Sequence, residues 1–204
     1  MPQGPLATAI AQIFGSTKYT PLVAGKQNDL LISQLHGTKY TPAYNAKLFS
    51  GANQTGVTTS AGLATTYVGL CLSNPANSAV NLIVRRVGGA FIVAPSTVTG
   101  FNLITGYAAG GITVHTTPVA PQCNLIGNAA VPVGKLDSAC TLVGTPLYSM
   151  VMGETPTATT LSFFNTDVEG AFVLIPGAYL AIGTTIAGPA SGFQGSIEWE
   201  EFPV

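Results

Sequence analysis

The stretch GAFVLIPGAYLAIG, residues Gly170–Gly183, is the most apolar part of the chain and decides its fold class. A membrane-spanning helix needs roughly 18 or more consecutive apolar residues. Here Pro176-Gly177 divides the apolar run into two pieces of strand length, Ala171–Ile175 and Ala178–Ile182. Because proline and glycine interrupt helices and favour turns, the stretch predicts two β-strands joined by a turn rather than a transmembrane helix.

Further strand candidates follow at short intervals from about residue 55. Gly88-Gly89 between two of them is a hairpin signal, because glycine tolerates the positive φ that two-residue hairpin turns need. The other candidates are Thr65–Leu72, Val80–Val87, Ala90–Val93, Ile112–His115, Leu147–Met152, Leu161–Phe164 and Ser196–Phe202. The 24 glycines and 14 prolines also disfavour long helices. We predict an all-β fold, a β-sandwich or jelly roll of about eight strands, with a barrel as the second choice.

The first 50 residues differ from this strand-rich remainder. Leu6–Phe14 (LATAIAQIF) predicts a short helix, and the pentapeptide Thr-Lys-Tyr-Thr-Pro occurs at Thr17–Pro21 and again at Thr38–Pro42. The repeat is either a reused turn or a pair of equivalent docking points on a symmetric partner. We therefore predict an N-terminal docking arm, residues 1–50, and a β domain, residues 51–204. The partner contacts expected in the arm are Lys18, Tyr19, Lys39 and Tyr40.

The chain is poor in charge. Only 7% of its 204 residues are charged, whereas 47% are hydrophobic and the mean hydropathy is +0.42. Globular domains usually carry about 25% charged residues. A surface that repels its neighbours so weakly suits a protein that lies against copies of itself or against a larger shell. The N-terminus lacks the basic start of a secretory signal, so we expect synthesis in the cytoplasm and three buried, reduced cysteines. The sequence leaves open a bond between Cys123 and Cys140, which would require their Cα atoms to lie within about 7 Å.

The few charges are unevenly distributed. Residues 1–102 hold six basic residues and one acid, a net charge of +5, whereas residues 103–204 hold one basic residue and seven acids, a net of −6. Between them, the 48 residues 87–134 contain no Lys, Arg, Asp or Glu. The opposite charges could join neighbouring subunits or neutralise one another within one subunit, and the sequence leaves both possibilities open.

Two strand candidates contain charges that break their alternation. Arg85 and Arg86 are adjacent and cannot share one face of a regular strand, and Glu201 shares a face with Ile197 and Trp199. Strand ends or β-bulges would explain both patterns. Alternatively, Arg86 and Glu201 form an ion pair, within the chain or across subunits. The alternation also predicts that Trp199 is buried.

The sequence offers little material for catalysis. His36 and His115 are isolated, and we expect both to be structural. No nucleophile elbow, phosphate-binding loop or zinc motif occurs. Seven basic residues on a chain of net charge −1 give no electrostatic footprint for nucleic acid. We expect no enzymatic activity, no cofactor, no metal, and neither nucleic acid nor membrane as a partner.

Three stretches together resemble uncharacterised virion structural proteins of tailed bacteriophages. They are LLISQLHGTKYTPAYNAKLFSGANQTGV (Leu30–Val57), LCLSNPANSAVNLIVRRV (Leu70–Val87) and PGAYLAIGTTIAGPASGFQGSIEWEEFPV (Pro176–Val204). The similar features are an SxLHGxxYTxxY opening, a Ser-Asn-Pro-Ala turn and a Gly-Ser-Ile-x-Trp-Glu-Glu ending. The resemblance implies a virion location and no catalytic residues.

The function expected from the resemblance is that of a capsid-associated protein of decoration (cement) or minor-capsid type. It would act as a homo-oligomer, a trimer by analogy, on the major capsid protein or other virion proteins. A head-fibre, connector or tail component is the alternative within the virion. A carbohydrate-binding β-sandwich is the alternative of another class, and it would use exposed aromatic residues such as Tyr107, Tyr148 or Trp199.

Overall fold

A computed structural model describes residues 38–155 and 161–204. Within it, a compact unit spans Lys39–Val204. The short helix expected at Leu6–Phe14, the histidine His36 and the candidate contacts Lys18 and Tyr19 lie outside the described residues. The unit includes residues 39–50, which we predicted to belong to the N-terminal arm.

The described residues form one short helix, α2 (Tyr40–Tyr44), and eleven strands, so the fold is all-β as predicted. The strands are β1 (Leu48–Ala52), β2 (Thr66–Ser73), β3 (Val80–Phe91), β4 (Gly100–Tyr107), β5 (His115–Val119), β6 (Gln122–Cys123), β7 (Lys135–Thr141), β8 (Leu147–Glu154), β9 (Phe163–Leu174), β10 (Ala178–Thr184) and β11 (Phe193–Pro203). In this part of the chain, no helix is long and apolar enough to cross a membrane.

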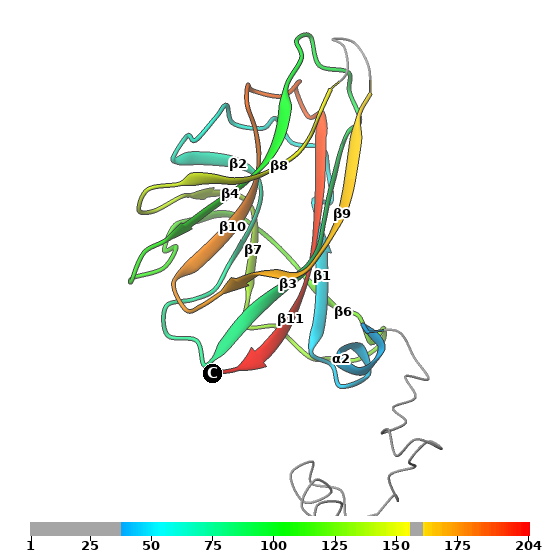
Figure 1. The fold of residues 1–204 in the computed structure, drawn as a ribbon, viewed down its shortest axis with the longest axis vertical. Coiled ribbons are helices and arrows are strands. Elements are labelled where there is room, and N and C mark those ends of the chain that lie inside the picture. Colours follow the sequence, from blue (N-terminus) through cyan, green and yellow to red (C-terminus); the bar gives the residue numbers. More distant parts are fainter. Residues whose placement is uncertain (1–37, 156–160) are drawn as a thin grey trace, which may run out of the picture. The chain divides into compact units, whose positions relative to one another are not determined.

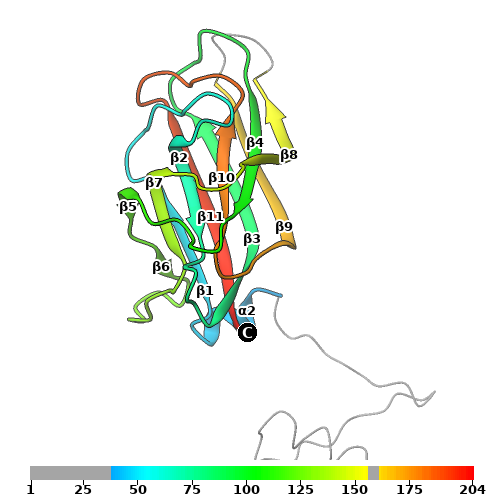
Figure 2. The same ribbon diagram turned by 90° about the vertical axis from the view of Figure 1, so that its left-hand side faces the viewer.

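The strands form two antiparallel sheets that face each other (Figure 1). The five-stranded sheet has the order β6-β1-β11-β3-β9, and the six-stranded sheet has the order β5-β7-β2-β10-β4-β8. Figure 2 looks onto the six-stranded sheet, with β5 and β6 along one side of the sandwich and β8 and β9 along the other. The sandwich therefore has two open sides, each bounded by one edge strand from each sheet.

The main core lies between the sheets. Trp199 of β11 is fully buried there, as its alternation with Ile197 predicts, and its ring centroid lies 6.1 Å from that of Phe49. A second aromatic group, built from Phe91, Phe101, Phe164 and Phe193, fills the same layer. Burial of these large rings, together with the leucine, valine and isoleucine side chains around them, stabilises the sandwich.

The predicted hairpin at Gly88-Gly89 is wrong, because β3 runs through both glycines without a turn. A Cβ on Gly89 would lie 2.8 Å from the Phe164 ring and 2.9 Å from the Phe193 ring. Glycine is needed here to admit two aromatic rings of the core rather than to reverse the chain.

The predicted turn at Pro176-Gly177 is present, but it does not close a hairpin. Gly177 has φ 90°, and Ala178 N donates to Ile175 O at 2.9 Å. β9 belongs to the five-stranded sheet and β10 to the six-stranded sheet, so this turn carries the chain from one sheet to the other.

A break in the β3 ladder explains the adjacent arginines. Glu198 pairs with Arg86 and Trp199 pairs with Val84, so Arg85 is an extra residue in β3 opposite β11. The pairing with β9 shifts at the same place. A β-bulge changes the phase of the alternation. Val84 and Val87 consequently both face the core, while Arg85 and Arg86 both reach the outer face.

All three cysteines are free and buried, as expected. Cys123 belongs to the main core, whereas Cys71 and Cys140 belong to a second apolar cluster that also contains Tyr67 and Tyr179.

Candidate functional site

Seven charged residues gather on the outer face of the five-stranded sheet, and we name this group the ion-pair field. Its middle row runs straight across the sheet, because Glu198 pairs with Arg86 and Arg86 pairs with Asp167 in the strand register. The members of the field are Lys39, Arg85, Arg86, Asp167, Glu169, Glu198 and Glu200.

Two of the predicted contact residues, Lys39 and Arg86, are engaged inside this field. Arg86 donates to Asp167 through Nε at 2.7 Å and through Nη2 at 3.1 Å. Lys39 Nζ lies 3.1 Å from Asp167 Oδ1 and 2.7 Å from Glu198 Oε1. Lys39 is the N-cap residue of α2, but its side chain makes no hydrogen bond to the helix. Its ammonium group pairs instead with the two acids of the sheet.

The bulged Arg85 completes the field on its other flank. Its guanidinium pairs with Glu200, and its Nη1 lies 4.0 Å from Glu169. Lys39, Arg85 and Arg86 from the basic half therefore pair with acids of the acidic half in the same chain. For these three residues, neutralisation within one subunit is the alternative that the structure supports.

Within this field, the pKa of Asp167 is shifted most from its ordinary value. Hydrogen bonds from Arg86 and then from Lys39 lower its pKa from 3.8 to about 2. A lowered pKa means that these interactions are complete above the ordinary pKa and are lost as the pH falls through about 2. We expect an NMR titration of the Asp167 carboxyl carbon to show a midpoint near 2.

In the Arg86→Gln variant, that midpoint should rise toward 3.8. Lys47→Gln is the matched control, since Lys47 is an exposed lysine outside the field, and it should leave the midpoint near 2. An ordinary midpoint in the wild-type protein would show that the field does not hold Asp167 in solution.

The predicted pairing of Arg86 with Glu201 does not form within the chain. Glu201 lies on the inward face of β11 and is only 5% exposed. Its carboxylate accepts hydrogen bonds from Val133 N at 3.1 Å, from Gly134 N at 2.9 Å and from Trp199 Nε1 at 3.3 Å. The same strand alternation that buries Trp199 directs Glu201 inward, where its carboxylate holds the backbone of the loop that contains Val133 and Gly134.

Tyr40 is partly exposed and stacks on Tyr44 of the same helix, with ring centroids 5.8 Å apart. Of the predicted contact residues, the structure brings Lys39 and Arg86 together on Asp167. Tyr40 follows Lys39 directly at the start of α2, whereas Glu201 lies on the other face of the sheet.

His115 and Asp137 form a hydrogen-bonded pair. His115 Nδ1 lies 2.7 Å from Asp137 Oδ2, and Nε2 donates to Ile112 O at 3.0 Å. Burial raises the pKa of Asp137, although the hydrogen bond and charge of His115 act in the opposite direction. Both ring nitrogens of His115 are therefore engaged in hydrogen bonds within the chain.

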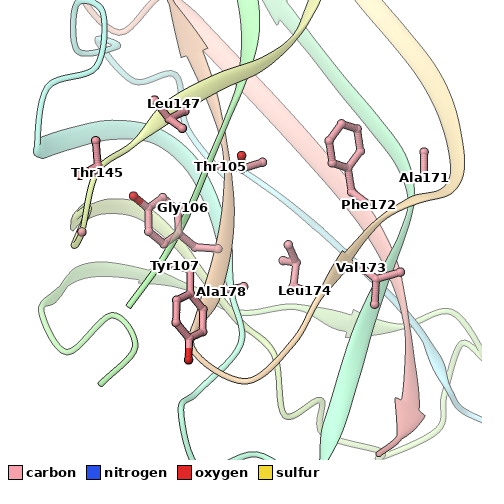
Figure 3. A pocket seen from close by; sticks show the side chains of 12 residues that line it. Thr105, Gly106, Tyr107, Thr145, Leu147, Ala171, Phe172, Val173, Leu174 and Ala178 are labelled. Carbon is pink, nitrogen blue, oxygen red and sulfur yellow. The ribbon is translucent and has the colours of Figure 1, made fainter. Parts of the chain in front are cut away.

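A cleft of about 710 Å³ opens between the sheets on the side bounded by β8 and β9, and we name it the β8–β9 cleft. Figure 3 shows residues of β4, the β7–β8 loop and β8 along one wall and Ala171–Leu174 of β9 along the other. Its described lining residues are all uncharged. Tyr107 stands at the rim with 55% of its surface exposed, whereas Leu174 and Tyr179 are buried.

The opposite open side carries an exposed loop between β6 and β7, residues 124–134, which we name the apolar loop. It contains no charged residue, and Ile126 and Val131 are 76% and 83% exposed. A second cleft of about 650 Å³ lies beside it and is lined partly by Pro118, Pro121 and Pro132. The lack of charge in residues 87–134 can be read from the sequence, but the position of this loop opposite the β8–β9 cleft cannot.

Comparisons with protein-family models, curated proteins and solved structures give no match for this chain. Among the described residues, no group of three or more His, Cys, Asp or Glu side chains could hold a metal ion.

Proposed function

We propose that this protein is a structural component of a bacteriophage virion, of capsid-associated decoration or minor-capsid type, acting through non-catalytic homo-oligomeric contacts. The observation that carries the proposal is the uncharged β8–β9 cleft on one open side of the sandwich together with the uncharged, partly exposed apolar loop on the other. Monomers seldom leave large contiguous apolar surfaces in water, and an uncharged surface is covered at a lower desolvation cost than a charged one.

The strand order supports a jelly roll as the finer description of the fold. If β5, β6 and β7 are set aside as an insertion, the remaining eight strands form two four-stranded sheets, β1-β11-β3-β9 and β2-β10-β4-β8. Successive strands from β1 to β4 alternate between the two sheets, and so do β8 to β11. This is the double Greek-key order of viral capsid and lectin jelly rolls, and the number eight agrees with the sequence expectation.

The virion location rests on this fold analogy and on the sequence resemblance, and the assembly role rests on the surfaces themselves. Synthesis in the host cytoplasm and a major capsid protein or another virion protein as the partner complete the proposal. The ion-pair field adds little to assembly, because its charges are satisfied within the chain.

Carbohydrate binding is the second candidate, since lectins use the same strand order and Tyr107 stands at the rim of a cleft. Trp199 cannot serve such a site because it is fully buried. Clear hits on a glycan array, lost in the Tyr107→Ala variant, would favour this candidate.

We expect the purified protein to be a closed homo-oligomer, a trimer by analogy, whose mass by light scattering is unchanged between low salt and 1 M salt. At 1 M ionic strength the Debye length falls to about 3 Å, which weakens contacts between exposed charges and leaves apolar contacts intact. A monomer at both salt concentrations would contradict the assembly role. Dissociation confined to high salt would show that charged contacts hold the oligomer.

Mass spectrometry of purified particles tests the virion location independently, and absence of the chain from them would contradict it.

A further inference from the structure

We propose that the oligomer is built head to tail, with the apolar loop of one copy inserted into the β8–β9 cleft of the next. This inference rests on the proposed homo-oligomeric function and adds the two surfaces that meet. Both surfaces belong to the same compact unit, so every copy carries one of each.

The apolar loop is held at both ends in a defined shape. At its start, Asn124 accepts a hydrogen bond from Ser50 at 2.6 Å and donates to Glu198 at 3.2 Å. At its end, the carboxylate of Glu201 receives the backbone N–H groups of Val133 and Gly134. Anchoring of this kind lowers the conformational entropy that the loop would lose on binding. The exposed side chains of Ile126 and Val131 therefore belong to a loop whose ends are already fixed before binding.

The β8–β9 cleft offers a surface of matching character. Leu147 and Val173 from its two walls are at least half exposed, as is Tyr107 at its rim. Gly106 makes room for the Tyr179 ring beside this wall, because a Cβ there would lie 2.2 Å from the Tyr179 hydroxyl oxygen. Neither surface carries a charge that would have to be removed from water unpaired, so burial of the apolar side chains is the dominant energetic term.

The positions of the two surfaces determine the symmetry of the contact. The apolar loop is on the β5–β6 side and the cleft is on the β8–β9 side, which Figure 2 shows to be opposite. A two-fold dimer brings the same patch of both subunits together, so a single two-fold interface centred on one side leaves the other side uncovered. A head-to-tail contact covers both sides and produces a ring when the rotation closes.

Pairing of a strand from the neighbouring copy with the exposed edge of β8 is less favourable than binding in the β8–β9 cleft. β8 pairs with β4 through two register irregularities, one between Phe101 and Asn102 and one between Leu103 and Ile104. Such bulges twist an edge strand away from a flat template and oppose edge-to-edge pairing. The cleft beside the edge, rather than the edge itself, is the site that accepts the neighbouring copy.

Cysteine cross-linking of the full chain tests the proposal. Val131→Cys on the loop and Val173→Cys in the cleft are made as separate variants, mixed and dissociated, reassembled, and treated with a short bismaleimide. We expect a dimer band from the mixture and none from either variant alone, because a head-to-tail contact joins two different positions. Wild type is the control for background reaction, since its three cysteines are buried.

A charge variant tests the same contact by affinity. Val131→Asp should weaken association at least tenfold, because the carboxylate would be buried in the cleft without a partner. Val204→Asp, at an equally exposed valine of the C-terminus, should leave association unchanged. An intact oligomer without the mixed cross-link, or a cross-link between two copies of the same variant, would overturn the head-to-tail arrangement. Neither result would remove the chain from the particle, so the proposed function and this inference can fail separately.

Discussion

Replacing Trp199 with alanine is expected to lower the free energy of unfolding by about 3–5 kcal/mol, because truncation of a buried aromatic side chain leaves a cavity that its neighbours fill only partly. Trp199 is fully buried between the sheets, contacts Phe49, and donates its indole N–H to Glu201. For a domain of this size, a loss of that magnitude lowers the thermal midpoint by about 6–20 °C.

Differential scanning calorimetry of the wild type and the variant measures this effect. Phe202→Ala is the matched control, since Phe202 is an aromatic residue of the same strand with an exposed side chain. We expect that control to change stability by less than about 0.5 kcal/mol. A shift for Trp199→Ala no larger than that of Phe202→Ala would show that Trp199 does not support the core.

The burial of Trp199 could be predicted because it depends only on alternation along one strand. Ile197, Trp199 and Glu201 share a face in any regular strand, and the first two require a core. The inward position of Glu201 follows from the same rule. Its partners do not, because Val133 and Gly134 lie 68 and 67 residues away in sequence and are brought to it by the fold.

The errors have a common origin in contacts between distant segments. Gly88-Gly89 carries a turn signal, but the rings of Phe164 and Phe193 decide that these glycines lie inside a strand. The segment between Phe164 and Ala171 is too polar to be predicted as a strand, yet it belongs to the edge strand β9, in which Val168 faces the core while Asp167 and Glu169 face the arginines of β3. Local propensity carries no information on either circumstance.

Only part of the ion-pair field could be predicted from the sequence. The break in alternation at Arg85-Arg86 indicated a bulge, and the bulge is present. The acids that meet these arginines come from β9 and β11, so the pairing depends on strand order, which charge counts do not contain. The β8–β9 cleft similarly depends on which strands form the edges of the two sheets.

Replacing Glu201 with alanine is expected to lower the free energy of unfolding by about 3–5 kcal/mol and to release the apolar loop. Three N–H donors would lose their acceptor, namely those of Val133, Gly134 and the Trp199 indole. Breaking a buried hydrogen-bonded charge site from one side leaves the remaining groups unpaired, which is more costly than the net value of the bonds themselves.

Hydrogen exchange separates the local effect from the global one. In Glu201→Ala, the amides of Val133 and Gly134 should exchange faster by a larger factor than amides of the distant strand β10, because the loop loses its anchor as well as sharing the global loss. Glu201→Gln keeps one acceptor oxygen and should fall between the wild type and alanine. Glu154→Ala, at an exposed glutamate on β8, should change neither stability nor exchange.

The Glu201→Ala variant also tests whether the anchored shape of the apolar loop matters for association. If the apolar loop binds the next subunit as a preorganised element, Glu201→Ala should weaken association even at temperatures where its β-sandwich remains folded, since the loop would have to be ordered on binding. Light scattering of the folded variant at a series of protein concentrations measures this. A variant with fast loop exchange and an unchanged association constant would show that the anchored shape of the loop is not what the neighbouring copy recognises.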